Sequence, residues 1–155
     1  ILAFDGYYEK KWFPYTMPIS DIYGLRQAFD NIKNNPYMLE RHAKIGNAVR
    51  AAVKEAGLEL YQETGFSNTV TVFNVPEGTT DTAILTAMKE KCNIMLAGSF
   101  GAFAGKVIRI GHMGENAYPE KVGAVMAGLD LVFKDLGITL KCSLKEAYDR
   151  KMSEQ

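Results

Sequence analysis

The stretch of this 155-residue chain that carries the most structural information reads Lys106-Val107-Ile108-Arg109-Ile110-Gly111-His112-Met113-Gly114. Successive side chains of a β-strand point to opposite faces of a sheet. Ile108 and Ile110 would therefore share one face, while Val107 and Arg109 share the other. The pattern predicts a strand over residues 106–111, in which the arginine points away from the two isoleucines.

Arg109 needs a partner if it lies in such a strand. Its guanidinium is permanently charged, and burying it unpaired would cost several kcal/mol. A carboxylate that accepts two parallel hydrogen bonds is the natural partner for this group. Both a bound ligand and a structural Asp or Glu of the chain could supply that carboxylate.

A glycine-rich loop precedes this strand and runs from Gly98 to Gly105. Glycines let backbone amides approach an anion, which invites comparison with phosphate-binding loops. The comparison fails, because Gly101 and Gly105 are one residue too close together and Val107 stands where Ser or Thr is required. The loop is therefore expected to join two strands, and a nucleotide site is disfavoured.

The remaining sequence predicts a domain of the α/β (α+β) class. Apolar periodicity predicts helices over residues 20–34, 36–56, 81–92 and 119–136 and from residue 143 onward. Expected side-chain caps are Ser20, Thr80 or Asp81, and Ser143 with Glu146 as a capping box. Further strands are predicted over residues 58–61, 69–75 and 94–97. Adjacent strands without long crossovers favour a mainly antiparallel sheet with helices on one face.

Residues 1–19 are expected to form an extended connector and not a helix, because they are rich in aromatic residues and contain Pro14 and Pro18. The chain begins at Ile1, without methionine, in an apolar stretch that suits either the interior of a longer polypeptide or a processed natural start.

Composition excludes several classes of function. The formal net charge is +0, which removes the attraction that nucleic-acid binders and membrane-surface proteins display. No apolar run approaches the roughly 20 residues of a membrane helix. Cys92 and Cys142 are far apart and have no Cys/His cluster nearby, so no metal site and no disulfide are expected. Two free cysteines are typical of a reducing compartment, so a cytoplasmic location is expected. His42 and His112 lack catalytic spacing and are interpreted as packing or surface residues.

The stretch 106–114 resembles the class V aminotransferases, the group that contains alanine–glyoxylate and serine–pyruvate aminotransferases. Other segments carry the resemblance in the family's order over nearly the whole chain, and they are residues 15–20, 22–28, 41–42, 57–60, 69–72 and 75–78.

This resemblance implies an enzyme of fold type I that depends on pyridoxal 5'-phosphate, in which a small C-terminal domain closes over a large cofactor-holding domain. Residues 1–35 would complete the large domain and its link, and residues 36–155 would form the small domain. The lysine that holds the cofactor would lie upstream of Ile1, so no catalytic residue is assigned here and the isolated chain is expected to be inactive.

The resemblance assigns two site residues by position. Arg109 would bind the α-carboxylate of the amino-acid or 2-oxo-acid substrate. Thr16 would reach across a homodimer interface to the cofactor phosphate of the other subunit. The related cysteine desulfurases place a reactive cysteine in the loop before the comparable arginine, and residues 98–105 contain none. That branch is therefore disfavoured.

The resulting hypothesis is a parent enzyme that moves an amino group between a small amino acid, alanine or serine, and a 2-oxo acid, glyoxylate or pyruvate. The alternative is a non-enzymatic regulatory module that binds amino acids, because its strand and helix order with a glycine loop would be similar.

Overall fold

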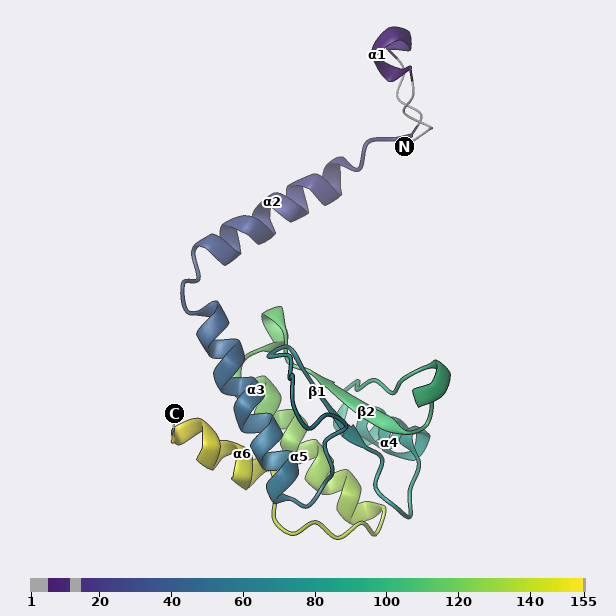
Figure 1. The fold of residues 1–155 in the computed structure, drawn as a ribbon, viewed down its shortest axis with the longest axis vertical. Coiled ribbons are helices and arrows are strands. Elements are labelled where there is room, and N and C mark those ends of the chain that lie inside the picture. Colours follow the sequence, from purple (N-terminus) through teal and green to yellow (C-terminus); the bar gives the residue numbers. More distant parts are fainter. Residues whose placement is uncertain (1–5, 12–14, 155) are drawn as a thin grey trace. The chain divides into compact units, whose positions relative to one another are not determined.

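A computed structural model of the chain describes residues 6–11 and 15–154. The elements in chain order are α1 (Tyr7–Lys10), α2 (Ile19–Lys33), α3 (Met38–Glu55), β1 (Val70–Asn74), α4 (Asp81–Cys92), the 3-10 turn η2 (Gly101–Phe103), β2 (Val107–Gly111), the 3-10 turn η3 (Gly114–Asn116), α5 (Pro119–Asp135) and α6 (Leu144–Ser153) (Figure 1). They fall into two compact units, residues 1–38 and residues 39–155.

The first unit holds α1 and α2. The expectation of a helix-free connector is wrong for residues 7–10, which form a single helical turn between Gly6 and Lys11, both with positive φ. Ser20 is not the N-cap of α2. The Ile22 amide already donates to the Pro18 carbonyl at 3.0 Å, so the helix begins two residues earlier and Ser20 lies inside its first turn.

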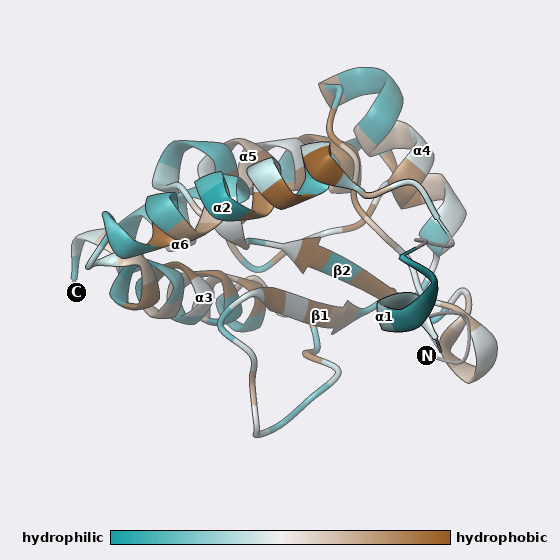
Figure 2. Cartoon of the chain, turned by 90° about the horizontal axis from the view of Figure 1, so that it is seen from above, coloured by the Kyte–Doolittle hydropathy of each residue, from teal (hydrophilic) through white to brown (hydrophobic). Residues whose placement is uncertain are grey.

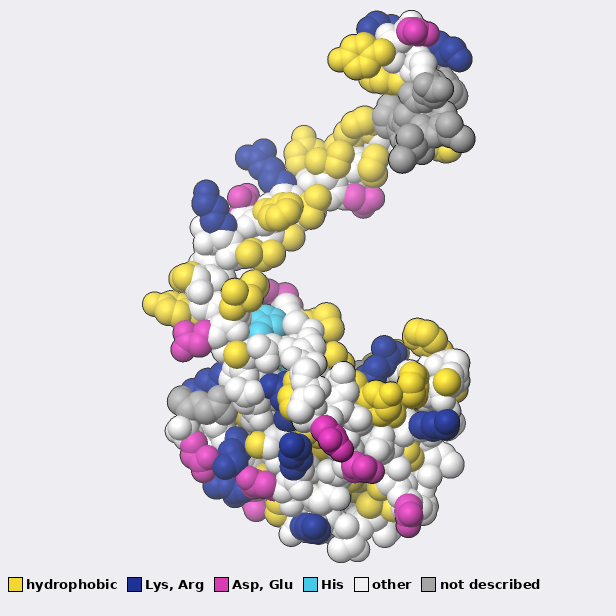
Figure 3. All heavy atoms as spheres, viewed as in Figure 1, with side chains coloured by type: hydrophobic (Ala, Val, Ile, Leu, Met, Phe, Trp, Pro, Cys, Tyr) yellow, Lys and Arg dark blue, Asp and Glu magenta, His cyan; other side chains and the backbone are white. Residues whose placement is uncertain are grey.

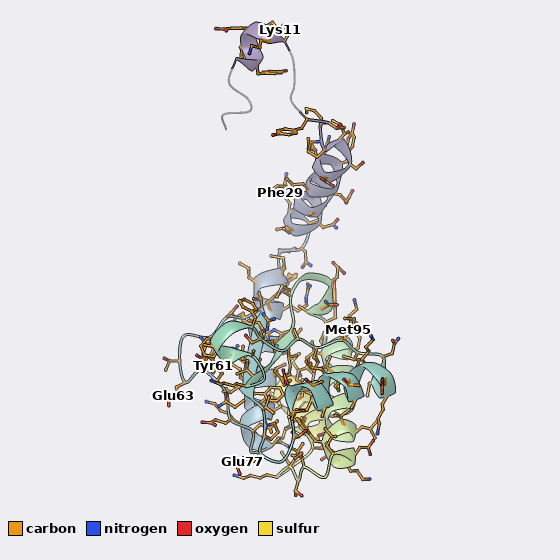
Figure 4. All side chains as sticks on the ribbon, turned by 90° about the vertical axis from the view of Figure 1, so that its right-hand side faces the viewer. Lys11, Phe29, Tyr61, Glu63, Glu77 and Met95 are labelled. Atoms are coloured by element: carbon orange, nitrogen blue, oxygen red, sulfur yellow. The ribbon has the colours of Figure 1, made fainter. Side chains whose placement is uncertain are left out.

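All residues of α2 are exposed. Its apolar side chains recur at helical spacing, and the large ones are Ile22, Leu25, Phe29 and Ile32, each between 48% and 62% exposed. Figure 3 shows hydrophobic side chains gathered along this helix, and Figure 4 labels Phe29. The predicted amphipathic helix is confirmed.

The second unit is organised around β1 and β2, which pair antiparallel with Val72 opposite Arg109 and Phe73 opposite Ile108. Figure 2 shows both strands as hydrophobic segments among the helices. The predicted strands over residues 58–61 and 94–97 are reduced to single antiparallel bridges, one of which joins Leu60 to Phe73 and the other Ala97 to Arg109. The sheet is antiparallel, as expected.

Both shortened strands begin in the cap of a preceding helix. The Leu58 amide donates to the Val53 carbonyl of α3 at 3.0 Å, and the Ile94 amide donates to the Met88 carbonyl of α4 at 3.2 Å. These bonds close the helix C-termini and use the first residues of each segment. Too few residues then remain for a longer ladder.

One face of the strands forms the core. Phe73, Ile108 and Ile110 are completely buried and pack with apolar residues of all four helices of the second unit. The core residues of these helices include Ile45 and Val49 of α3, Ile84 and Met88 of α4, Met126, Leu129 and Phe133 of α5, and Leu144 and Tyr148 of α6. The opposite face carries Val70, Val72, Asn74, Val107, Arg109 and Gly111, of which only Val107 is buried. Helices therefore cover one face of the sheet.

The starts of α4 and α6 follow the predicted side-chain caps, whereas α3 begins later than predicted. Thr80 Oγ1 accepts from the Ala83 amide at 3.2 Å and starts α4. Pro36 does not occupy the first turn of α3, because a turn closed by the Met38 amide on the Asn35 carbonyl comes first.

Ser143 caps α6 through the Glu146 amide, but the capping box is not completed by the Glu146 side chain, which makes no hydrogen bond to a described residue. The Asp130 carboxylate of α5 instead accepts from Ser143 Oγ and from the amides of Leu144 and Lys145. These three bonds tie the start of α6 to α5.

Among the described residues, no helix combines the length and the apolar character needed to cross a lipid bilayer.

Candidate functional site

Arg109 is the central residue of β2 and lies on the face of the sheet opposite to the core. The residue is partly buried. Its main chain pairs with the Ala97 segment, since the Arg109 amide donates to the Ala97 carbonyl at 2.7 Å. Its Nε donates to the Gly98 carbonyl at 2.6 Å. The main chain of residues 97–98 therefore holds both the backbone and the side chain of Arg109.

No carboxylate among the described residues forms an ion pair with Arg109. The ion pairs among the described residues join Lys91 to Asp135, Lys145 to Asp149, Arg150 to Glu55, and Lys151 to Glu55 and Glu154. Of the two carboxylate sources that the sequence left open, a structural acid of the described chain is therefore excluded. The two terminal nitrogens of Arg109 have no hydrogen-bond partner among the described residues, and they can bind an anion.

Arg109 lines two hollows on the second unit. The smaller one has a volume of about 190 Å³, and its other lining residues are Tyr61, Gln62, Val72, Ser99, Phe103 and Val107. The larger one, about 710 Å³, extends along residues 94–97 toward Met113 and the start of α5. Figure 4 labels Tyr61 and Met95, which belong to the segments that flank β1 and β2 respectively.

The loop over residues 98–105 forms one wall of the smaller hollow. Its η2 turn places the Phe103 ring against the Tyr61 ring, edge to face, with centroids 5.2 Å apart. Such a contact stabilises a loop by about 0.5–1.5 kcal/mol beyond the burial of its area. The loop is followed by β2 and not by a helix, which confirms that it joins β-paired segments and lacks the geometry of a phosphate-binding loop.

Arg50 is the contrasting arginine. It is 8% exposed, and its terminal nitrogens donate to the Ser67 carbonyl at 2.9 Å and to Asn47 Oδ1 at 2.6 Å. Burial lowers its pKa. Neutral oxygens of its own fold satisfy this guanidinium, so Arg50 stabilises the join between α3 and the loop before β1, whereas the terminal nitrogens of Arg109 remain available.

Thr16 lies in the first unit, in the short segment before α2. Its side chain is exposed, and its hydroxyl has no hydrogen-bond partner among the described residues. A free hydroxyl can donate to a phosphate oxygen. The chemistry of this residue therefore fits a phosphate contact.

The two histidines have packing roles, which confirms one of the interpretations from the sequence. His112 is fully buried, with Nδ1 3.1 Å from the Asn68 carbonyl oxygen and Nε2 2.9 Å from Thr71 Oγ1. Because a carbonyl oxygen only accepts, Nδ1 carries the proton and the threonine hydroxyl donates to Nε2 of the neutral ring. His42 Nε2 accepts from the Gly114 amide at 3.0 Å.

The stability of the chain is expected to fall when the pH is lowered through about 6.5. Burial lowers the pKa of His112 from its ordinary value of 6.5, Arg50 and His42 lower it further, and the hydrogen bond to Asn68 opposes them. The unfolded chain then binds this proton more readily than the folded chain, so stability present above the unfolded pKa is lost as pH falls. Urea unfolding between pH 7.5 and 5.5 should reveal a slope of up to about 1.4 kcal/mol per pH unit.

A matched pair of variants isolates this contribution. His112→Gln should flatten the slope below pH 6.5, whereas His42→Gln should retain most of it, because burial is the largest cause of the His112 shift and His42 the smallest. An unchanged slope in His112→Gln would assign the effect to other groups.

The sequence placed Val107 on the same face as Arg109 but did not single out the other residues that share the smaller hollow with it. Tyr61 follows the Leu60 bridge and Ser99 follows Gly98, so both flank segments that pair with the two strands. The sequence predicted strands over residues 58–61 and 94–97, and pairing these segments with β1 and β2 would have indicated that Tyr61 and Ser99 lie near Arg109.

No protein-family model matches this chain. An uncharacterised aminotransferase of Methanocaldococcus jannaschii is 38% identical over 148 residues, which is 91% of this chain and 37% of the relative. Serine–glyoxylate aminotransferase of Arabidopsis thaliana is 36% identical over 130 residues, which is 81% of this chain and 32% of that protein. The chain thus spans about a third of the length of these relatives.

Solved structures of aminotransferases are also similar to this chain. Pyridoxamine–pyruvate aminotransferase of Mesorhizobium loti superposes with a TM-score of 0.85 at 28% identity, over 99% of this chain and 41% of that structure. Ureidoglycine–glyoxylate aminotransferase of Bacillus subtilis superposes with a TM-score of 0.86 at 26% identity, again over 99% and 41%. The arrangement of elements described above therefore recurs within larger aminotransferases.

Proposed function

Because this chain belongs to the class V-like aminotransferases, of which it forms a C-terminal part, we propose that the longer polypeptide transfers an amino group between a small amino acid and a 2-oxo acid. Alanine or serine would be the donor, and glyoxylate or pyruvate the acceptor. By their names, relatives of this chain act on serine with glyoxylate or on pyruvate with pyridoxamine. Serine, glyoxylate and pyruvate are small and carry a carboxylate, which supports the proposed substrates.

The observation that carries this proposal is that the end of the Arg109 guanidinium is available to a ligand. Its Nε is held by Gly98, its two terminal nitrogens have no described partner, and it lines a hollow of about 190 Å³. All the proposed substrates share a carboxylate, which accepts two parallel hydrogen bonds from such a fork. Arg109 would bind this group and orient the rest of the substrate for reaction.

Aminotransferases of this fold type depend on pyridoxal 5'-phosphate. When bound, the cofactor supplies an aldehyde that takes up the amino group and a ring that stabilises negative charge. Within this chain Thr16 would donate a hydrogen bond to the cofactor phosphate of the other subunit of a homodimer. That role is supported by the exposure of Thr16 and by its hydroxyl, which has no hydrogen-bond partner in the part of the chain that the structure describes.

The domain assignment follows from the same proposal. Residues 1–35 would complete the large cofactor-holding domain, and residues 36–155 would form the small domain that carries Arg109. The catalytic lysine would come from the rest of the polypeptide, and the 155-residue chain alone would therefore be inactive.

Absorbance spectroscopy tests the proposal. The full-length protein, purified with pyridoxal 5'-phosphate, should show a protein-bound chromophore near the edge of the visible range that changes when alanine or serine is added. Glyoxylate or pyruvate should then restore the original spectrum. A regulatory module that merely binds amino acids would remain colourless, and that result would replace the enzymatic proposal.

The 155-residue chain serves as the control in the same experiment. It should neither develop this spectral change nor produce an oxo acid from alanine. Turnover by the isolated chain would contradict the proposal that the catalytic lysine lies elsewhere.

A further inference from the structure

We propose that Gly98 is a positioning residue that sets the direction from which Arg109 receives its ligand. The inference rests on the proposed function, because it assumes that Arg109 binds the substrate carboxylate. It adds a residue to which no contact with the substrate is assigned, and which acts only through the guanidinium.

A guanidinium offers a carboxylate two kinds of edge. One is the side that contains Nε and one terminal nitrogen, and the other is the end that contains both terminal nitrogens. In Arg109 the Gly98 carbonyl occupies Nε at 2.6 Å. The side edge is therefore blocked, and a carboxylate can form two parallel hydrogen bonds only at the end of the fork.

The Gly98 carbonyl is held in place because the preceding residue, Ala97, pairs with Arg109 through both its carbonyl and its amide. The adjacent Ala97 accepts from the Arg109 amide at 2.7 Å, and its own amide donates to the Arg109 carbonyl at 3.4 Å. The main chain of residues 97–98 thus contacts the main chain and the side chain of Arg109 together. Moving this segment would move the guanidinium with it.

Position 98 has little room for a side chain. A Cβ built there would lie 3.2 Å from Asp81 Oδ2 and 3.4 Å from Leu85 Cδ1, both at the start of α4. Asp81 is not free to move away, because its Oδ1 accepts from the Thr82 amide at 2.7 Å and from the Thr82 hydroxyl at 3.2 Å. A methyl group at position 98 would therefore displace the loop and carry its carbonyl away from Arg109.

The backbone conformation does not by itself require glycine here. Gly101 and Gly105 in the same loop have φ of +60° and +75°, where other residues are strained, but Gly98 is not among the glycines with positive φ. The expected effect of Gly98→Ala thus arises from the contact with α4. This makes it reversible by a second substitution at Asp81.

The first test needs no enzymatic activity. In the 155-residue chain, the Nε–H of Arg109 should exchange with solvent more slowly than the Nε–H of Arg26, an exposed arginine of α2, as followed by NMR. Gly98→Ala should remove this protection. Equal exchange of the two arginines in the unaltered chain would overturn the proposal.

The second test uses the full-length holoenzyme. Gly98→Ala should raise KM for the amino acid and for the oxo acid about tenfold, with a smaller change in kcat. A tenfold change is the size expected when roughly one hydrogen bond to the substrate is lost. Adding Asp81→Ala should restore KM, because it removes the nearest atom that the new methyl meets. A double variant as impaired as Gly98→Ala would contradict the mechanism.

Gly128→Ala is the matched control, since its added Cβ would lie 3.0 Å from Met88 Cε and 3.3 Å from Cys92 Sγ. It crowds α4 in the same way but is not bonded to Arg109, so it should lower stability and leave KM unchanged.

Failure of the inference and failure of the proposed function give different results. If Arg109→Ala raises KM but Gly98→Ala does not, the carboxylate role stands and the inference about Gly98 is wrong. If Arg109→Ala leaves KM unchanged, the proposed role of Arg109 fails, while the exchange measurement still reports on Gly98.

Discussion

Replacing Arg109 with alanine in the full-length enzyme is expected to lower kcat/KM for both substrates by roughly 30- to 1,000-fold. The loss corresponds to about 2–4 kcal/mol of transition-state binding, which is typical for removing a charged group that holds the reacting molecule. The physical reason is that the terminal nitrogens of Arg109 have no other described partner. Steady-state kinetics with alanine and with glyoxylate measure the effect.

Arg41→Ala is the matched control for this experiment. Arg41 also donates through Nε to a carbonyl, that of Ala117 at 2.7 Å, and its guanidinium lies 4.4 Å from the Tyr118 ring centre. Its loss should cost stability without the same loss of kcat/KM. Arg109→Lys should be impaired as well, because an ammonium cannot supply the planar fork. Unchanged kinetics in a folded Arg109→Ala protein would remove the carboxylate role.

Phe73→Ala is expected to destabilise the 155-residue chain by about 3–5 kcal/mol. Phe73 is completely buried, faces Ile108 across the strand pair, and packs edge to face on Phe133 with ring centroids 6.4 Å apart. Deleting its ring leaves a cavity where β1 meets α5. A loss of this size is a large fraction of the roughly 5–15 kcal/mol that stabilises an ordinary domain.

Urea unfolding followed by circular dichroism measures this loss. Phe100→Ala provides the same chemical change at a side chain that is 79% exposed, and it should alter the free energy of unfolding by no more than about 0.5 kcal/mol. Equal effects of the two substitutions would mean that β1 does not pack as described.

The strand containing Arg109 and most helices could be predicted from the sequence, because their signals are local. Alternation placed Ile108 and Ile110 on one face of a strand, which is the buried face, and apolar periodicity predicted the helix over residues 36–56, whose buried residues include Ile45 and Val49. Side-chain oxygens predicted two helix starts, at Thr80 and at Ser143. The prediction of strand length failed where helix caps competed for the same residues.

The features that were missed depend on contacts between distant parts of the chain. The carboxylate of Asp130 caps α6 from a neighbouring helix, a role that no spacing around Ser143 could indicate. The carbonyl that holds Arg109 comes from Gly98, eleven residues earlier. Both atoms become partners only after the chain folds back on itself, so local patterns contain no trace of them.

The presence of Arg109 in a strand was predictable, but the partner of its guanidinium was not. The residues alone allowed a structural acid or a ligand as its partner, and only the ion pairs of the folded chain separated the two. The assignment of Arg109 to a substrate carboxylate came from the family resemblance and is now supported by the open end of its fork.

The most direct measurement compares alanine with alaninamide, which lacks the carboxylate charge, as amino donors for the full-length enzyme and for its Arg109→Ala variant. The account predicts that the unaltered enzyme prefers alanine by roughly 100-fold and that the variant loses most of this preference. If the preference for alanine survives in Arg109→Ala, another group binds the carboxylate and the central claim is wrong.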